Sequence, residues 1–542
     1  MTTPQLPNAP WQSLHLALPL PAHETDAFVT EDLAPLMDRR EGADWFFIRY
    51  GEGGPHLRIR FRGTGGQAHT LTKELGRLAA RRTPPDGPWT ARHGEVTAVR
   101  YEPETERYGG RGLLPVAEEL FARSTRTAVG ALRTLGPDGA ARLPLALDLA
   151  HTTAHGLGMD ELTAARWLRR HSASWRWVTE FRPLPGAAVH SRVNTVFARQ
   201  RQSLARRATA LRTALDTDTA EPWLSDWFAS VMEAAGRMRF EAPEASEERL
   251  LWVWASQLHM LFNRLGVGPD EERAVCRLAG RTLLETDPPF DFFPEGADAP
   301  DRQYLERSKF QIGRPEDTAL PEVPPLEVPR PSPVDVPLPA DPLPAVPLAD
   351  ALLARRSVRG RLTGPLTAGE VGGLLWSACA PNRPTGDRPY PSAGGMRAVR
   401  VRLLALAVDG LPAGTYHCVP ELRCLRPIGP APEPEQLKAL SYYLSRPASD
   451  PQSLIADEAP AVLAIHLDLA RLRQRYGLRA LRLGLVETGH LAQNLLLTAT
   501  AFGLGTTPLG GLFDDLAHEL LALDDLDEPI QYLLPLGRPA TP

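Results

Sequence analysis

The chain has 542 residues, of which 43% are hydrophobic and 23% are charged, and its formal net charge is −5 at pH 7. This length exceeds what one hydrophobic core usually organises, so at least two domains are expected. The charge balance gives no indication of a nucleic acid or an anionic membrane as a partner. Four scattered cysteines, none in a CxxC pair, exclude a disulfide scaffold and a zinc cluster, and no metal site is expected.

The first half predicts strands followed by helices. Strands are expected at 14–20, 45–50 and 56–62, and a glycine-rich turn joins the last two. Residues 115–215 and 222–285 predict helices. Residues 1–10 contain no basic-then-apolar targeting signal, and no apolar run approaches ~18 residues, so we expect a cytoplasmic protein without a membrane span.

A proline-rich stretch divides the chain. Prolines recur every few residues between 315 and 347, which excludes a helix or a central strand and favours an extended linker or strap. The expected domains are therefore 1–290 and 348–542, with the linker or strap at 291–347. After it, helices at 348–356, 367–378 and 484–502 alternate with strands at 398–408, 461–467 and 531–536, so both halves predict an α+β fold.

Three segments of the first half contain candidate functional residues. In a strand at 56–62, His56, Arg58, Arg60 and Arg62 share one face. A solvated outer face is the ordinary explanation of such alternation. Three arginines in line, without an alternating acid, repel one another and favour a bound anion.

The second segment, 101–110, contains Glu104 and Arg107 beside two tyrosines and would be a surface loop if taken alone. The third is a helix at 248–265, in which Trp252, Ser256, His259 and Asn263 fall on one stripe. Its histidine is either a hydrogen-bonded core residue or a general base on a rigid helix.

In the second half, Arg355, Arg356, Ser357 and Arg359 form a cluster suited to a phosphate, because guanidinium groups make charge-assisted bonds to its oxygens. A solvated helix end is the alternative. The segment 391–395 has paired glycines, which permit close approach to a planar ligand but also suit a simple turn. A helix at 484–502 then leads into a glycine-rich loop at 503–511.

These motifs, taken in order, resemble the nitroreductase-like flavoproteins over roughly residues 301–542. The closing Leu534-Pro535-Leu536-Gly537 belongs to the same pattern. The resemblance implies a homodimer with FMN at the subunit interface. The residues that it implies as FMN contacts are Arg355, Arg356, Ser357, Arg359, Pro391, Ser392, Ala393, Gly394, Gln493, Asn494, Gly510 and Gly511.

The segment 487–494 resembles most the subfamily that oxidises azolines to azoles in ribosomally made peptides. That subfamily usually has a Lys-Tyr pair shortly before this helix, whereas this chain has Arg475-Tyr476. Arginine keeps its proton in proteins. Either Tyr476 accepts the substrate proton, or Arg475 acts only through its charge.

The three segments of the first half resemble, over about residues 10–285, the elimination domain of lantibiotic-type dehydratases. That family removes glutamate from glutamylated serine or threonine and leaves dehydroalanine or dehydrobutyrine. By this resemblance His259 removes the α-proton, and Arg58, Arg60 and Arg107 stabilise developing negative charge and grip a glutamyl carboxylate. Glu104 would orient Arg107 or engage the glutamyl ammonium.

The combination resembles the bifunctional proteins of lactazole-type thiopeptide pathways. The implied partners are a glutamylated, azoline-containing precursor peptide and other enzymes of the same pathway. Two alternatives concern the first half: a pyridine-forming cycloaddition domain, or a domain that only binds the precursor peptide. For the second half, the alternative is a general nitroreductase that uses NAD(P)H.

Overall fold

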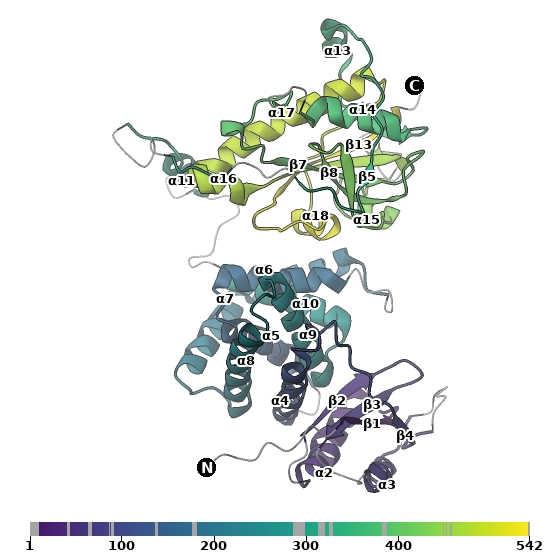
Figure 1. The fold of residues 1–542 in the computed structure, drawn as a ribbon, viewed down its shortest axis with the longest axis vertical. Helices are drawn as coiled ribbons and strands as arrows, with labels where there is room; N and C mark the ends of the chain where they lie inside the picture. Colours follow the sequence, from purple (N-terminus) through teal and green to yellow (C-terminus); the bar gives the residue numbers. More distant parts are fainter. Residues whose placement is uncertain are drawn as a thin grey trace. The chain divides into compact units, whose positions relative to one another are not determined.

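The computed structural model forms two compact units, Met1–Leu184 with Ala188–Asp287, and Pro288–Pro542 with Pro185–Ala187 (Figure 1). Each unit has its own hydrophobic core. Among the described residues, no helix is both long and apolar enough to cross a membrane. The structure describes residues 10–40, 44–62, 68–85, 87, 92–135, 139–175, 182–285, 299–312, 320–324, 329–381, 387–447, 449–450, 453–455 and 458–539.

The first unit begins with a four-stranded antiparallel sheet of order β2-β3-β1-β4. The three expected strands are present, and the short edge strand β4 was not predicted. Small helices, including α2 and α3, lie along one side of this sheet (Figure 1). The bounds are β1 Gln12–Ala17, β2 Asp44–Tyr50, β3 His56–Arg62, β4 Val96–Val99, α1 Ala22–Ala27, the π-helix η1 Phe28–Leu33, α2 Ala34–Asp38 and α3 Ala68–Ala79.

A helical bundle follows the sheet, as the sequence predicts. Helix α9 begins at the Ser246 cap, whose Oγ accepts a hydrogen bond from the Arg249 amide. It ends where Gly266 takes a left-handed conformation, with φ of 80°, so α10 starts after a short turn. The bounds are α4 Leu114–Arg133, α5 Arg142–Gly156, α6 Glu161–Ser174, α7 Gly186–Asp216, α8 Pro222–Glu241, α9 Glu247–Leu265 and α10 Pro269–Leu283.

The second unit contains a nine-stranded sheet of order β10-β6-β13-β11-β7-β8-β9-β5, and β12 also pairs with β13. All seven residues of β11 are buried, because both faces of the central sheet are covered. The bounds are β5 Val336–Pro337, β6 Gly360–Thr363, β7 Val399–Ala405, β8 Gly414–Val419, β9 Cys424–Gly429, β10 Leu454–Ile455, β11 Ala461–Leu467, β12 Gly505–Thr506 and β13 Ile530–Pro539.

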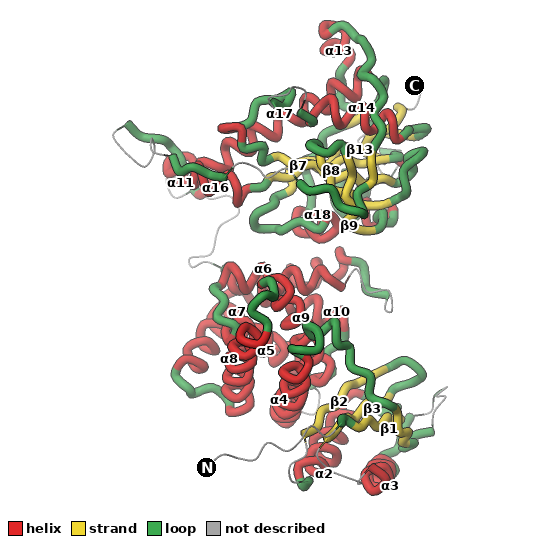
Figure 2. The backbone as a smooth tube through the Cα atoms, in the orientation of Figure 1, coloured by secondary structure: helices red, strands yellow, loops and turns green. Residues whose placement is uncertain are grey.

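Helices α14 and α17 lie on one face of this sheet, and α18 lies on the other (Figure 2). Helix α17 corresponds to the expected segment 484–502, but it starts four residues earlier and ends one residue earlier. The bounds are α11 Pro300–Arg307, α13 Leu348–Ala354, α14 Ala368–Cys379, η3 Ala393–Gly395, α15 Pro434–Lys438, α16 Leu469–Tyr476, η5 Gly477–Arg479, α17 Ala480–Ala501 and α18 Asp514–Leu521.

The described part of the proline-rich stretch packs on the second unit. Strand β5 pairs with β9 at the edge of the sheet, where a proline is tolerated. Trp376 of α14 donates its indole N–H to the Leu338 carbonyl at 3.3 Å. A Cβ on Gly372 would lie 1.9 Å from the Pro339 carbonyl oxygen, so only glycine permits this approach. Residues 291–298, 313–319 and 325–328 of the expected linker lie outside the described residues.

Candidate functional site

The arginine face of β3 alternates as predicted. His56, Arg58, Arg60 and Arg62 are partly exposed, and the apolar residues between them are buried. Arg62 pairs with Asp44 of β2, with Nη2 and Oδ2 at 3.0 Å. Strand β3 itself contains no acid, and the acidic partner of Arg62 comes from the neighbouring strand.

The other two arginines lie against aromatic rings. The Arg58 guanidinium is 3.3 Å from the centre of the Tyr50 ring. Arg60 lies 5.0 Å from the Tyr101 ring and 5.5 Å from the Phe46 ring. Burial lowers the pKa of Arg60, and its buried Nε has no hydrogen-bond partner among the described residues. Arg60 is therefore a desolvated cation suited to an anionic group.

The 101–110 segment brings Glu104 and Arg107 to helix α9. Arg107 Nη1 donates to Glu104 Oε2 at 3.0 Å, and its Nε donates to Ser256 Oγ at 3.3 Å. Burial opposes the charge of Arg107, but Tyr108 and Glu104 outweigh it and raise the pKa of this guanidinium. Because Ser256 lies three residues before His259 in α9, Arg107 lies beside the candidate base.

His259 makes a contact that the sequence analysis missed. Its Nδ1 lies 2.9 Å from Oε2 of Glu272 in the first turn of α10. The His259 side chain is 20% exposed, whereas Glu272 is 1% exposed. Glu272 lies thirteen residues after His259 and on the next helix. The turn at Gly266 brings the two helices together, so the contact could be predicted only if that turn were predicted first.

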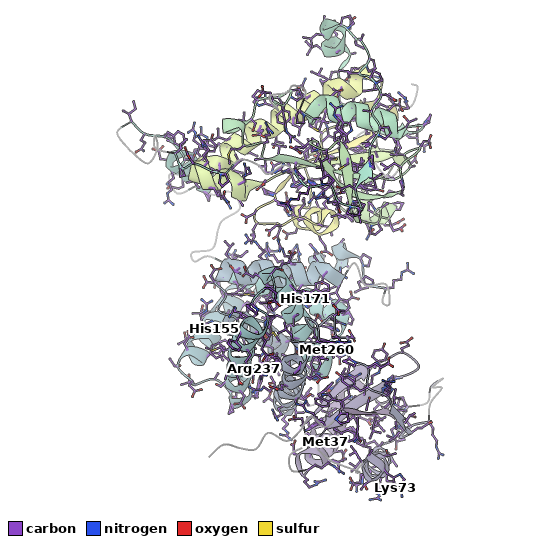
Figure 3. All side chains as sticks on the ribbon, viewed as in Figure 1. Met37, Lys73, His155, His171, Arg237 and Met260 are labelled. Atoms are coloured by element: carbon purple, nitrogen blue, oxygen red, sulfur yellow. The ribbon has the colours of Figure 1, made fainter. Side chains whose placement is uncertain are left out.

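Glu272 has further polar partners. Its Oε1 lies 2.6 Å from His171 Nε2 of α6 and accepts the Trp175 indole N–H at 3.2 Å. Figure 3 labels His171 and Met260, the neighbour of His259, within the helical bundle. Burial would raise the pKa of Glu272, but the two histidines lower it to about 2. The buried carboxylate is therefore ionised at neutral pH.

This ionised carboxylate predicts a loss of stability in acid. Its pKa is depressed in the folded chain, so its contribution is complete above the ordinary value of 4.5 and is lost as the pH falls toward about 2. We expect the free energy of unfolding of the unmodified chain to fall more steeply across that window than the free energy of unfolding of Glu272→Gln. Urea titration followed by circular dichroism measures both. Equal pH slopes for the two chains would contradict this; Glu271→Gln is the matched control.

Asn263 and Arg264, near the end of α9, support the fold. Asn263 bonds to both the amide and the carbonyl of Arg49, each at 2.9 Å, and so joins α9 to β2. Arg264 is fully buried against Phe46 and Phe121, and burial lowers its pKa to about 9. These contacts position α9, and with it His259, against the sheet.

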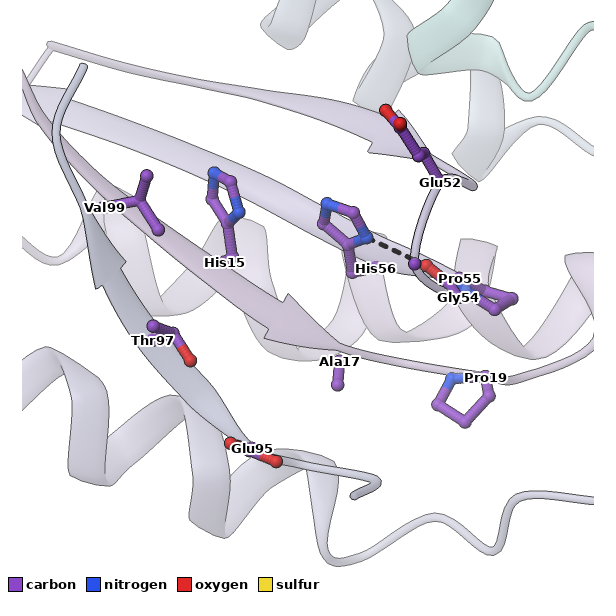
Figure 4. Close-up of a pocket in the computed structure, with 11 residues that line it drawn as sticks. His15, Ala17, Pro19, Glu52, Gly54, Pro55, His56, Glu95, Thr97 and Val99 are labelled. Atoms are coloured by element: carbon purple, nitrogen blue, oxygen red, sulfur yellow. Dashed lines mark hydrogen bonds between the residues drawn. The ribbon is translucent and has the colours of Figure 1, made fainter. Parts of the chain in front are cut away.

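A cavity of about 250 Å³ opens beside the arginine face. His15 and His56 stand next to each other in it, with ring centres 5.2 Å apart (Figure 4). Burial, then Arg58, lowers the pKa of His15 to about 4. His56 Nε2 accepts from Arg58 Nε at 3.2 Å, so the cavity adjoins the arginines. It is lined by His15, Ala17, Pro19, Glu52, Gly53, Gly54, Pro55, His56, Glu95, Thr97 and Val99.

In the second unit, the 391–395 loop is held by buried Glu487 of α17. Glu487 Oε2 accepts from Ser392 Oγ at 2.9 Å and from the Ala393 amide at 3.3 Å. Burial raises the pKa of this carboxyl against these hydrogen bonds. Gly394 and Gly395 take left-handed conformations, with φ of 54° and 65°. Glu487 begins the 487–494 segment, but it was not among the predicted site residues.

The predicted Arg475-Tyr476 pair lies against the same loop. A Cβ on Gly394 would lie 2.3 Å from Tyr476 Oη and 3.4 Å from Arg475 Nε. Arg475 Nη1 donates to the Pro321 carbonyl at 3.3 Å. Asn494 Nδ2 donates to the Pro389 carbonyl at 2.9 Å, and Gln493 is exposed. A cleft of about 720 Å³ adjoins the loop and is lined by Asp387, Arg388, Pro389, Tyr390, Pro391, Ser392, Gly395 and Arg397.

The remaining predicted FMN contacts lie elsewhere. The 355–359 segment pairs with the loop after α17, where the Val358 amide donates to the Thr506 carbonyl at 3.1 Å. Gly510 and Gly511 follow in that loop, and the Gly511 carbonyl accepts from Ser441 Oγ. About 20 Å of α17 separates Glu487 from the end of the helix at Ala501. One chain therefore presents two separate groups of predicted contacts.

Comparisons with known proteins match the two halves of the chain to two different families. The family model for the C-terminal part of the lantibiotic biosynthesis dehydratase matches residues 11–283, and the nitroreductase family model matches residues 352–538. A Methanocaldococcus jannaschii protein described as a nitroreductase is 32% identical over 191 residues, 35% of this chain and 90% of that protein. The microcin B17-processing protein of Escherichia coli is 30% identical over 141 residues. That match spans 25% of this chain and 49% of the relative.

Solved structures resemble each half separately. The pyridine synthase of thiomuracin biosynthesis has a TM-score of 0.39 and 20% identity, covering 50% of this chain and 97% of its own. A Desulfovibrio desulfuricans nitroreductase-type protein in complex with FMN has a TM-score of 0.26 and 19% identity, covering 36% and 88%. The chain therefore belongs to the lantibiotic dehydratase C-terminal family in its first half and to the nitroreductase family in its second half.

Proposed function

We propose that this chain modifies a ribosomally made peptide in two ways. Its first unit eliminates glutamate from glutamylated serine or threonine, and its second unit oxidises azolines to azoles with FMN. The observation that supports the first activity best is the hydrogen bond from Arg107 to Ser256, one turn before His259 in α9. Two activities in one chain raise the effective concentration of each site near a bound peptide.

Elimination requires a base and cationic groups, and the first unit supplies both. His259 accepts the α-proton of the reacting residue. Arg60 is desolvated, and Arg107 is held by Glu104, so both can stabilise charge that develops on the amide oxygen and the departing carboxylate. Arg58, two residues from Arg60 on the same face, is available to grip the glutamyl group.

The second unit supplies residues that fit a flavin. At Gly395, no atom of the described residues lies within 4 Å of a Cβ position, so the backbone of this loop permits close approach of a planar ring. The predicted phosphate contacts are Arg355, Arg356, Ser357 and Arg359. Their segment is hydrogen-bonded to β12 through Val358 and Thr506, and Gly510 and Gly511 follow β12 in the chain. FMN would supply the hydride acceptor, and Tyr476 would take the proton from the azoline ring.

Because the two groups of contacts lie at different ends of α17, we propose a homodimer in which each FMN contacts both subunits. The exposed side of α17 includes Leu485 and Val486, which are 47% and 57% exposed. Apolar side chains in such a position are consistent with a subunit interface. The precursor peptide and other enzymes of its pathway are the further proposed partners.

Mass spectrometry of a glutamylated, azoline-containing precursor peptide tests both activities at once. After incubation with the FMN-loaded chain, we expect loss of glutamate and loss of two hydrogens per azoline. Hydrogen loss alone would leave the first unit as a peptide-binding or pyridine-forming domain. Reduction of bound FMN by NAD(P)H, but not by the azoline peptide, would instead favour a general nitroreductase.

A further inference from the structure

The contact between His259 and Glu272 defines the state of the candidate base. A carboxylate ionised at neutral pH accepts hydrogen bonds and cannot donate them. The 2.9 Å contact between Nδ1 and Oε2 therefore places the imidazole hydrogen on Nδ1. The lone pair of the neutral ring is then on Nε2, on the partly exposed side chain.

The carboxylate itself is held in place from several sides. His171 and Trp175 occupy Oε1, at 2.6 and 3.2 Å, while His259 occupies Oε2. The Trp175 ring also packs edge-on against His259, with ring centres 5.0 Å apart. Since both oxygens are bonded and the group is buried, Glu272 cannot rotate away from His259 without leaving buried polar groups unpaired.

We propose that Glu272 is the positioning carboxylate of a Glu272–His259 pair that keeps Nε2 free as the base for elimination. This inference rests on the proposed function of the first unit. No feature of the sequence near His259 indicates the pair, because Glu272 lies on the next helix and reaches His259 only across the turn at Gly266.

The pair accounts for each proton and bond of the reaction. Nε2 takes the α-proton of the glutamylated residue, and the electrons of that C–H bond form the Cα=Cβ double bond. The bond from Cβ to the ester oxygen breaks, and glutamate leaves as a carboxylate. His259 becomes an imidazolium beside ionised Glu272, which stabilises it until the proton passes to solvent.

The same arrangement explains why the base lies next to Arg107. Arg107 bonds to Ser256, three residues before His259 in α9, and Glu272 contributes to the raised pKa of Arg107. Glu272 therefore balances the charge of two cationic groups that face the substrate, the arginine and the imidazolium. Without it, protonation of His259 beside Arg107 would place two positive charges together in a partly buried site.

Glu272→Gln in the full chain tests the proposal. Glutamine keeps the shape but has one acceptor oxygen and one NH2 donor, and it has no charge to balance the imidazolium. We expect elimination from a glutamylated peptide to slow by about 10²-fold. Affinity for a glutamyl-amide analogue that cannot eliminate should change less than about threefold, because a positioning residue acts on the rate. Glu271→Gln is the control. Glu271 lies in the same turn of α10 but accepts a hydrogen bond from the Gly268 amide, so its replacement should leave the elimination rate and the affinity for the analogue unchanged.

A second measurement requires only the unmodified chain. Nuclear magnetic resonance of a chain with ¹⁵N-labelled histidine reports which ring nitrogen carries hydrogen. The signals of His259 are those that are absent from the spectrum of His259→Asn, and they should show hydrogen on Nδ1 and none on Nε2. Hydrogen on Nε2 would overturn the inference, as would a Glu272→Gln chain that eliminates as fast as the unmodified one. In that second case the proposed elimination would stand. If the unmodified chain does not eliminate glutamate, the proposed function fails and the inference fails with it.

Discussion

Replacement of His259 by asparagine is expected to slow glutamate elimination by about 10²- to 10⁴-fold while leaving azoline oxidation unchanged. The asparagine Nδ2 can still donate to Glu272, so the buried carboxylate keeps a partner and the helices keep their packing. What is lost is Nε2, the only ring nitrogen that Glu272 leaves available. Dehydroalanine formation and hydrogen loss can both be followed by mass spectrometry in the same sample.

The chain offers a matched control for this substitution. His155 of α5 also contacts a carboxylate, with Nε2 at 2.7 Å from Oδ1 of Asp216 at the end of α7. Neither α5 nor α7 contains a predicted site residue. His155→Gln should therefore eliminate glutamate at the normal rate. Normal elimination by His259→Asn would show that another group is the base. A first unit that binds peptide in both variants, yet never forms dehydroalanine, would favour the peptide-binding alternative.

Local patterns were sufficient for three of the four strands and for the helical bundle of the first unit. The alternation of β3 and the helical stripe that contains His259 both follow from neighbouring residues, and the structure has both. Contacts between elements were not predictable in the same way. Glu272 reaches His259 only after α9 and α10 pack, and Asp44 reaches Arg62 only through the β2–β3 register. The Asp44–Arg62 pair therefore could not be predicted from strand 56–62 alone.

The second unit shows the same limit on a larger scale. Motif order gave a predicted set of flavin contacts, and Tyr476 and Arg475 lie against one of them, Gly394. The order could not show that the 355–359 and 391–395 segments are anchored near different ends of α17. Distance along a rigid helix decides that question, and sequence spacing does not. The homodimer proposed above would bring the two segments together in one site.

Replacement of Tyr476 by phenylalanine is expected to slow azoline oxidation by about 10²-fold. Tyr476 Oη is the polar atom nearest to the Cβ position of Gly394, in the loop where the flavin ring is expected. Arg475 cannot accept a proton, and its Nη1 is engaged by the Pro321 carbonyl. Reduction of bound FMN by an azoline peptide, followed anaerobically as loss of yellow colour, measures this step without reoxidation.

Two comparisons separate a proton acceptor from a structural tyrosine. Tyr416→Phe removes a different hydroxyl, which donates to the Pro412 carbonyl at 2.8 Å on β8, and should oxidise azolines normally. Arg475→Gln should reduce the rate by less than about tenfold, because it removes only a charge near the loop. FMN content should be equal in all three variants. If Arg475→Gln oxidised azolines slowly while Tyr476→Phe oxidised them normally, Tyr476 would not be the proton acceptor. The charge of Arg475 would then contribute more to the rate than the tyrosine hydroxyl does.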